Sequence, residues 1–179
     1  MHISQNPRRA PVFWLTGLPS AGKTTLASLL KEELDRQNQA SVVLDGDELR
    51  KSISSELGFS KEDRETHIKR VANVAKLLSK NGIISIVALI SPYLSSRAYG
   101  RELIGSGFIE VWVKCPVEIC RQRDVKGLYG KAEKGRIGDM TGIQAPYEAP
   151  NNPEVIVDTE KENKDTCLTS ILKYWRSIQ

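Results

Sequence analysis

The sequence has few of the residues from which metal clusters and crosslinked scaffolds are built. It contains 3 Cys and 2 His, and the cysteines, Cys115, Cys120 and Cys167, include no Cys-x-x-Cys pair. An odd number of widely spaced cysteines argues against a disulfide framework and against a Cys/His zinc site. Reduced thiols are typical of the cytosol, so we expect a cytoplasmic protein.

Long hydrophobic runs are also absent. The longest, Ile83 to Ile90, has eight residues, whereas a membrane-spanning helix needs about 20. The apolar stretch near the N-terminus, Pro11 to Leu15, is shorter and leads directly into Gly17, which does not fit a secretory signal. We therefore expect neither membrane insertion nor secretion.

Aromatic residues are sparse, at 6% of the 179 residues, and charges nearly balance, with a formal net charge of +4. The excess indicates an anionic partner. It is concentrated between residues 121 and 136, where six basic and two acidic residues also give +4. A nucleic-acid groove would interleave aromatic and basic residues, and only Tyr129 does so there, so we expect no nucleic acid.

Short β-branched or aromatic runs alternate with longer amphipathic stretches. The pattern predicts strands at 12–16, 41–44, 83–89, 108–113 and 155–157, and helices at 23–37, 60–80 and 162–177. The capping-box pattern at 60–63 predicts where the second of these helices begins. The alternation predicts a single α/β domain over residues 1–179, with three layers and a mostly parallel five-stranded sheet.

Ligands of such sheets bind beyond the carboxyl ends of the strands. The segments to examine are therefore 17–24, 45–47, 91–93 and the residues after Lys114. The stretch from Lys126 to Pro153 is rich in Gly, Pro and charge and has no sustained period, which predicts a loop without regular structure. Because a loop of this length is typical of active-site lids, we expect a lid at about 124–153.

One segment matches the phosphate-loop pattern G-x-x-x-x-G-K-[ST] and is followed by a second threonine: Gly17-Leu18-Pro19-Ser20-Ala21-Gly22-Lys23-Thr24-Thr25. It lies between a predicted strand and a predicted helix, as this motif requires. Backbone N–H groups would surround a polyphosphate, Lys23 would reach its β and γ phosphates, and the Thr24 hydroxyl would bind Mg²⁺. The alternative is a glycine turn with an exposed lysine. The motif favours a phosphate-loop kinase-like fold that uses ATP and Mg²⁺.

Two carboxylates, Asp45 and Asp47, follow the second predicted strand, whereas the strand ending at Ile90 leads into Ser91 without an acid. One carboxylate can lie near Mg²⁺ or an attacking hydroxyl and the other near an acceptor, which suits phosphoryl transfer to a small molecule. The alternative is a turn in which Asp47 caps a helix over 48–54.

Basic residues of the 121–136 stretch can fold over ATP and offset the charge of the transferred phosphoryl group. We predict Arg121 and Arg123 as ATP-binding residues. For Lys131 and Lys134 the simpler interpretation is that their side chains belong to a charged face exposed to solvent.

Further motifs follow the phosphate loop in order: Leu-Asp-Gly-Asp (44–47), Leu-Gly-Phe-Ser (57–60), Asp63-Arg64, Ile-Ser-Pro-Tyr (90–93), Lys-Gly-Leu-Tyr (126–129), Thr-Gly-Ile (141–143) and Pro-Tyr-Glu-Ala-Pro (146–150). Together they resemble the adenylyl-sulfate kinase family, which phosphorylates the ribose 3′-hydroxyl of adenosine 5′-phosphosulfate with ATP. The resemblance extends from about residue 11 to residue 158 and implies a homodimer.

The resemblance implies roles for residues around the acceptor nucleotide. Asp47 and Arg50 would contact the acceptor, Phe59 would stack on its adenine, and Arg64 would bind its phosphosulfate side. Lys126 would approach the same group from the lid.

Ile90 and Ser91 would line the acceptor pocket. In bacterial members the serine matching Ser91 is assigned as a phosphorylated intermediate, and a purely binding or capping role is the alternative. Asp45 would be the Mg²⁺-linked or base-like carboxylate, and a direct in-line transfer needs only Lys23, Mg²⁺ and a lid.

The sequence departs from the family pattern at three positions: His67 stands where Asn is usual, Met140 where a Phe closes the adenine clamp, and Leu94 where a basic residue is common. We place His67 and Met140 in the acceptor site; a histidine in the core or on the surface of the long helix is the alternative for His67. Two other functions remain open: a 3′-kinase for a related nucleotide 5′-conjugate, and a nucleotide-binding module without catalysis.

Overall fold

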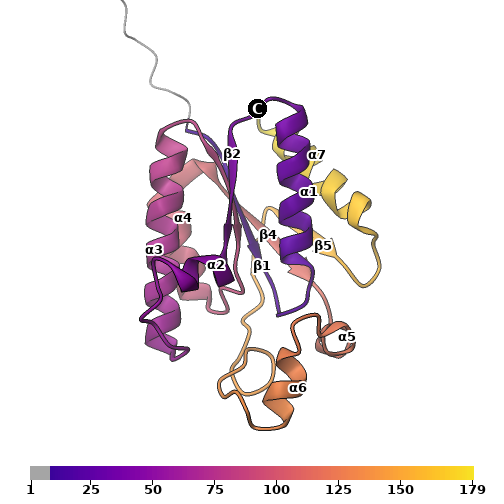
Figure 1. Ribbon diagram of the computed structural model, residues 1–179. Coiled ribbons are helices and arrows are strands. Elements are labelled where there is room, and N and C mark those ends of the chain that lie inside the picture. The colour runs from indigo at the N-terminus through magenta and orange to yellow at the C-terminus, as the bar shows by residue number, and fades with distance from the viewer. Residues whose placement is uncertain (1–8) are drawn as a thin grey trace, which may run out of the picture.

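The computed structural model describes residues 9–179, in which five parallel strands form one sheet between two layers of helices (Figure 1). In chain order the elements are β1 (Val12–Thr16), α1 (Lys23–Arg36), β2 (Ser41–Asp45), α2 (Gly46–Lys51), α3 (Lys61–Lys80), β3 (Ile84–Ala88), α4 (Leu94–Ile104), the short 3₁₀ helix η1 (Gly105–Gly107), β4 (Phe108–Lys114), α5 (Val117–Arg123), α6 (Leu128–Glu133), β5 (Val155–Asp158) and α7 (Lys164–Ser177). The strand order is β2-β3-β1-β4-β5. The predicted α/β class is confirmed, and all the strand pairs are parallel.

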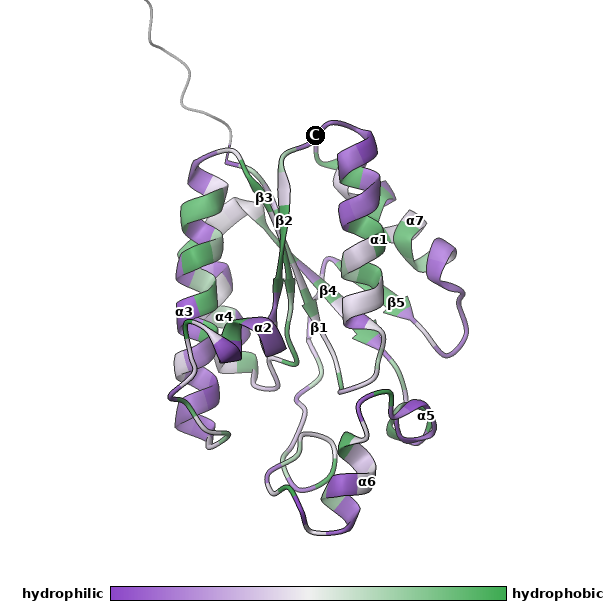
Figure 2. Ribbon diagram, viewed as in Figure 1, coloured by the Kyte–Doolittle hydropathy of each residue, from purple (hydrophilic) through white to green (hydrophobic). Residues whose placement is uncertain are grey.

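The central strand β1 supplies side chains to both faces of the sheet. Phe13 and Leu15 belong to the hydrophobic cluster under α1 and α7, which includes Trp175, whereas Val12 and Trp14 belong to the cluster under α3 and α4. Successive strand residues point to opposite faces, so a strand buried on both sides is apolar throughout. Figure 2 shows the hydrophobic colour on the strands and on the helix faces that cover them.

Two helix starts follow from side-chain caps. The Ser60 hydroxyl accepts from the N–H of Asp63 at 3.1 Å, as the sequence predicts for α3. At α2 the alternative in which Asp47 caps a helix over 48–54 is wrong: Asp45 Oδ1 accepts from the N–H of Asp47 at 2.9 Å, and the helix ends at Lys51. The cap comes earlier because the chain turns into α2 directly at the last residue of β2.

Helices α4, α5 and α6 are absent from the sequence-based prediction. In α4, three of the four buried residues are Ser96, Arg97 and Gly100, so no apolar period marks its inner face. Helices α5 and α6 have 7 and 6 residues, too few for two full turns. The lid region therefore contains one short helix, and not only irregular loop as expected. No helix among residues 9–179 is long and apolar enough to cross a membrane.

Candidate active site

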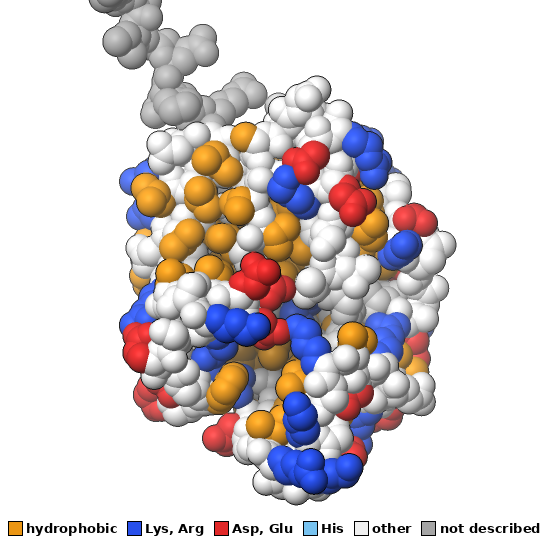
Figure 3. Space-filling view, viewed as in Figure 1, with side chains coloured by type: hydrophobic (Ala, Val, Ile, Leu, Met, Phe, Trp, Pro, Cys, Tyr) orange, Lys and Arg blue, Asp and Glu red, His pale blue; other side chains and the backbone are white. Residues whose placement is uncertain are grey.

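A pocket of about 790 Å³ lies at the carboxyl ends of β1, β2 and β3, where the parallel sheet predicts it. Its wall is formed by residues of the phosphate loop, the β2–α2 turn, the segment after β3 and the lid region. Helix α3 and the loop before it add Phe59, Arg64 and His67. Figure 3 shows the hollow in the lower half of the molecule, with basic and acidic side chains around it. Its volume is in the range of small-molecule sites.

The phosphate loop is held in the conformation that anion binding requires. Gly22 has φ 100° and precedes α1, whose first turn receives no side-chain cap. The N–H groups of that turn are therefore free to meet an anion, with the positive end of the helix dipole behind them. Gly17 lies so close to β4 that a Cβ there would stand 2.4 Å from the carbonyl oxygen of Val113. Glycine is needed at position 17 to start the loop.

Lys23 lies folded back on this loop. Its Nζ donates to the carbonyl oxygens of Gly17 at 2.9 Å and Leu18 at 2.7 Å. Burial lowers the pKa of Lys23 from 10.5 to about 8, against smaller opposing effects from acidic neighbours such as Asp47. A polyphosphate would offer this ammonium stronger acceptors than the two carbonyls do.

The carboxylates predicted after β2 face the end of the phosphate loop. Asp45 Oδ2 accepts from the Thr24 hydroxyl at 3.1 Å, while its other oxygen caps α2. Asp47 forms an ion pair with Lys126 of the lid region, and the Asp47 hydrogen bond is the main cause that raises the pKa of Lys126. The structure thus brings Thr24 and Asp45 together as one pair, and Asp47 and Lys126 as another.

Elsewhere on the pocket wall, Phe59 lies next to two guanidinium groups. The Arg50 and Arg64 groups stand 4.7 Å and 5.7 Å from the ring centroid, and the ring remains 56% exposed. Arg64 is buried and donates to the carbonyl oxygens of Phe59 and Asp139 and to the Thr141 hydroxyl. Phe59, Arg50 and Arg64 thus place an aromatic ring and two cations together on the pocket wall.

His67 lines the same side of the pocket and is almost fully buried. Its Nδ1 shares a hydrogen bond of 2.9 Å with the Ser54 hydroxyl, and its Nε2 has no partner among the described residues. Burial, followed by the charges of Arg50 and Arg70, lowers the pKa of His67 to about 4. The imidazole is therefore neutral at physiological pH.

Ile90 and Ser91 line the pocket after β3, and Ser91 has a left-handed backbone with φ 39°. The indole Nε1 of Trp14 donates to Ser91 Oγ at 3.1 Å. Pro19, Ser20, Gly22 and Thr25 also line the pocket, while Gly17, Leu18 and Ala21 shape the loop without lining it.

Besides Gly17, Leu18 and Ala21, three more predicted site residues do not line the pocket. Met140 is 7% exposed and packs in the hydrophobic cluster under α1 and α7, so it faces no open volume opposite Phe59. Arg121 forms an ion pair with Glu133. Arg123 donates to the Oγ1 and carbonyl oxygen of Thr159 and thus lies next to the phosphate loop, outside the pocket.

Sequence reasoning missed several residues that surround the site. Val125 and Leu128 line the pocket from the lid region, and Thr141 receives a hydrogen bond from Arg64. Thr159, directly after β5, donates to the carbonyl oxygen of Ala21 at 2.9 Å and so holds the phosphate loop from outside. Leu128 and Thr141 belong to motifs at 126–129 and 141–143, whereas the only sequence signal for Thr159 is its position at a strand end.

Comparison with known proteins shows the family of this chain. The family model described as Adenylylsulphate kinase matches residues 9–158. The adenylyl-sulfate kinase of Clostridium acetobutylicum is 44% identical over 167 residues, which cover 93% of this chain and 84% of that protein. The probable adenylyl-sulfate kinase of Bacillus subtilis is 43% identical over 171 residues, covering 95% and 87%.

Solved structures agree. The Mycobacterium tuberculosis APS kinase in complex with AMPPNP and APS superposes with a TM-score of 0.91 at 36% identity, covering 95% of this chain and 99% of that chain. A hexameric APS kinase from Thiobacillus denitrificans has a TM-score of 0.72 at 30% identity, and the match covers 96% of this chain and 30% of that chain.

Proposed function

The chain belongs to the adenylylsulphate kinase family, and from that premise we propose that it transfers the γ-phosphoryl group of ATP to the ribose 3′-hydroxyl of adenosine 5′-phosphosulfate. The observation that carries the proposal is a pocket with two unlike sides. One side is a phosphate loop with a buried lysine, and the other is an exposed phenyl ring next to two guanidinium groups. The product is 3′-phosphoadenosine 5′-phosphosulfate.

The phosphate-loop side binds ATP. The N–H groups at the start of α1 and the Lys23 ammonium hold the β and γ phosphates, and Lys23 exchanges the carbonyls of Gly17 and Leu18 for phosphate oxygens. Arg123, beside this loop, and Arg121 on the same helix supply further positive charge after the lid moves. Residues 124–153 form the lid.

The Thr24 and Asp45 pair fits Mg²⁺. A hydroxyl and a carboxylate oxygen lie 3.1 Å apart at the pocket wall, and no cluster of three acidic, His or Cys ligands exists within residues 9–179. Mg²⁺ usually takes one or two protein oxygens and completes its shell with phosphates and water. When bound, Mg²⁺ neutralises charge on the phosphate oxygens. Asp45 Oδ2, which does not cap α2, is the carboxylate oxygen for this role or for accepting the proton of the attacking hydroxyl.

The opposite side binds the acceptor. Phe59 stacks on the adenine, because its ring is exposed and aromatic faces stack on bases. Arg64 keeps N–H donors beyond the three it already uses, and these bind the phosphosulfate side. Asp47 and Arg50 contact the acceptor from α2, and Lys126 approaches the acceptor from the lid.

His67, Ile90 and Ser91 complete the acceptor wall. A nucleophilic serine needs a base that takes its proton, whereas the partner of Ser91 Oγ is an indole N–H, which only donates. We therefore assign Ser91 a binding role and the reaction a direct in-line transfer. A homodimeric, cytoplasmic enzyme stays a prediction of the family resemblance.

Turnover assays over several adenosine 5′-conjugates with Mg·ATP test the proposal. Phosphosulfate should give the highest kcat/KM, and the Lys23→Ala variant should give none. The alternative function is a 3′-kinase for a related nucleotide 5′-conjugate. It is motivated by His67, which lies on the pocket wall at a position where the family usually has Asn. Negligible turnover of phosphosulfate with good turnover of another conjugate would contradict our choice, and ATP binding without transfer to any conjugate would indicate a non-catalytic module.

A further inference from the structure

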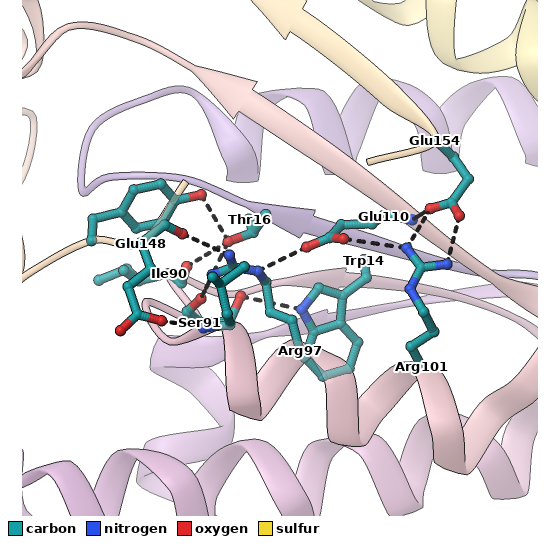
Figure 4. Close-up of polar contacts among 11 residues, drawn as sticks. Trp14, Thr16, Ile90, Ser91, Arg97, Arg101, Glu110, Glu148 and Glu154 are labelled. Carbon is teal, nitrogen blue, oxygen red and sulfur yellow. Dashed lines mark hydrogen bonds and ion pairs between the residues drawn. The ribbon is translucent and has the colours of Figure 1, made fainter. Parts of the chain in front are cut away.

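Four buried or half-buried charges lie beside the acceptor wall and take no part in the roles assigned above. Arg97 and Arg101 come from α4, Glu110 from β4, and Glu154 directly precedes β5 (Figure 4). Glu110 pairs with Arg97 at 2.8 Å and with Arg101 at 3.2 Å, and Arg101 pairs with Glu154 at 2.5 Å. Charges this deep in a protein need such partners, because an unpaired buried charge is very unfavourable.

The two arginines differ in what else they bind. Arg101 contacts the two carboxylates and the ring of Phe108. Arg97, which is 2% exposed, also donates to two main-chain carbonyls: Nη1 to Ser91 and Nη2 to Glu148, each at 2.6 Å. Arg97 therefore connects this group of charges to Ser91 of the pocket wall, whereas Arg101 makes no such contact.

The first of these two carbonyls belongs to Ser91, a residue with a strained backbone. Ser91 is not a glycine, yet its φ is 39°. Such backbone persists only where the surroundings impose it. The Thr16 hydroxyl donates to the carbonyl oxygen of Ile90 at 2.8 Å, and Trp14 donates to Ser91 Oγ. Arg97 completes this set of donors at the carbonyl oxygen of Ser91.

The second carbonyl belongs to a segment in the last part of the lid region, which we call the strap (residues 145–150). Glu148 of the strap donates its N–H to the carbonyl oxygen of Pro92 and accepts from the N–H of Leu94. The Tyr147 hydroxyl lies 3.0 Å from the Thr16 hydroxyl. Arg97 thus holds the strap and the acceptor wall with one planar group.

We propose that Arg97 is a positioning residue for phosphoryl transfer: it fixes the main chain of Ser91, and with it the acceptor wall, relative to the strap. Ion pairs buried in this way add little net stability over apolar side chains of the same size. An apolar side chain has no donors for two carbonyls, and lysine lacks the planar fork that reaches both. The inference rests on the proposed function for its substrate.

The kinetic test compares Arg97→Lys with Arg101→Lys, two variants of one helix and one set of charges. We expect Arg97→Lys to lower kcat/KM for adenosine 5′-phosphosulfate about 10- to 100-fold, since misplaced binding groups have effects of this size. The KM for ATP should change less than about twofold, because the phosphate loop is untouched. Arg101→Lys should leave both parameters near those of the wild type.

A spectroscopic test needs no substrate. The indole N–H of Trp14 donates to Ser91, so its NMR resonance, assigned with Trp14→Phe, reports the position of the serine. The resonance should shift in Arg97→Lys and stay in place in Arg101→Lys. If Arg97→Lys does not fold, the double variant Arg97→Met/Glu110→Leu removes both charges together and should show the same shift and the same kinetic loss.

The outcomes separate the two proposals. An unshifted indole resonance in Arg97→Lys, equal shifts in the two lysine variants, or unchanged acceptor kinetics in an active enzyme would each overturn the role of Arg97. A wild type that does not turn over phosphosulfate contradicts the proposed function alone. The indole shift then decides the positioning role, and acceptor kinetics are measured with the conjugate that is turned over.

Discussion

The Thr24 hydroxyl donates to Oδ2 of Asp45 across 3.1 Å, which joins the start of α1 to the end of β2. The same carboxylate uses Oδ1 to cap α2. Asp45 therefore has a structural oxygen and a pocket-facing oxygen, and a substitution can separate the two roles.

Asp45→Asn should lower kcat about 100-fold or more, because the variant loses the charge needed for metal binding or proton transfer. The amide oxygen still caps α2, so the melting temperature should stay within a few degrees. Steady-state kinetics and thermal unfolding measure the two effects. Glu48→Gln is the control, since it removes a charge from the first turn of the same helix outside the pocket. A variant Asp45→Asn with a kcat close to wild type would refute the assignment.

ATP affinity should fall as the pH rises above about 8. Lys23 of the free protein loses its proton near that pH, so ATP binding must then take up a proton, and Kd should rise by up to about tenfold for each further pH unit. Titration calorimetry in two buffers of different ionisation enthalpy measures the uptake. In Lys23→Arg the guanidinium keeps its charge, and the dependence should disappear. A wild-type Kd that is flat from pH 7 to about 9.5 would contradict this prediction.

Phe59→Ala should raise the KM for the acceptor about 5- to 150-fold, the range that corresponds to roughly 1–3 kcal/mol of stacking per base. The KM for ATP should not change, and stability should change little because the ring is 56% exposed. Leu77→Ala, which removes an exposed apolar side chain from α3 away from the pocket, is the control. Equal acceptor KM values for the two variants would exclude stacking.

His67 should make the protein less stable in mild acid. Its pKa is about 4 in the folded chain and about 6.5 when exposed, so between these values the unfolded chain binds the extra proton and stability falls as the pH falls. Going from pH 7 to pH 5, the wild type should lose on the order of 2 kcal/mol more than His67→Asn. Urea unfolding at both pH values gives the difference. Parallel losses in the two proteins would show that His67 titrates normally.

Sequence patterns predicted the parts of the fold that rest on local composition. The strands are dense in β-branched residues, and the phosphate loop combines glycines with a following amphipathic helix, so both are visible without tertiary information. Helix α4 is different, because the burial of Arg97 depends on Glu110, which lies on another element. From sequence alone an arginine is predicted to lie on the surface, because the partner that allows its burial belongs to another element.

In the candidate site, too, residues in local motifs were predictable from the sequence, whereas residues placed by tertiary contacts were not. Asp45, Lys23 and Phe59 belong to compact motifs, and the structure places all three at one pocket. Met140 was placed there by resemblance, but the fold buries its side chain in a hydrophobic cluster. Thr159 belongs to no motif, and only the pairing of β5 with β4 brings it to the phosphate loop.

The contact between Thr159 and Ala21 also affects the order in which the molecule can be assembled on the ribosome. The two residues are 138 positions apart. At translation rates of about 5–20 residues per second, the phosphate loop exists for roughly 7–28 s before Thr159 is made. The ATP site, encoded early in the chain, is therefore completed late, and a nascent chain has no finished nucleotide site for a ligand to stabilise until β5 has joined the sheet.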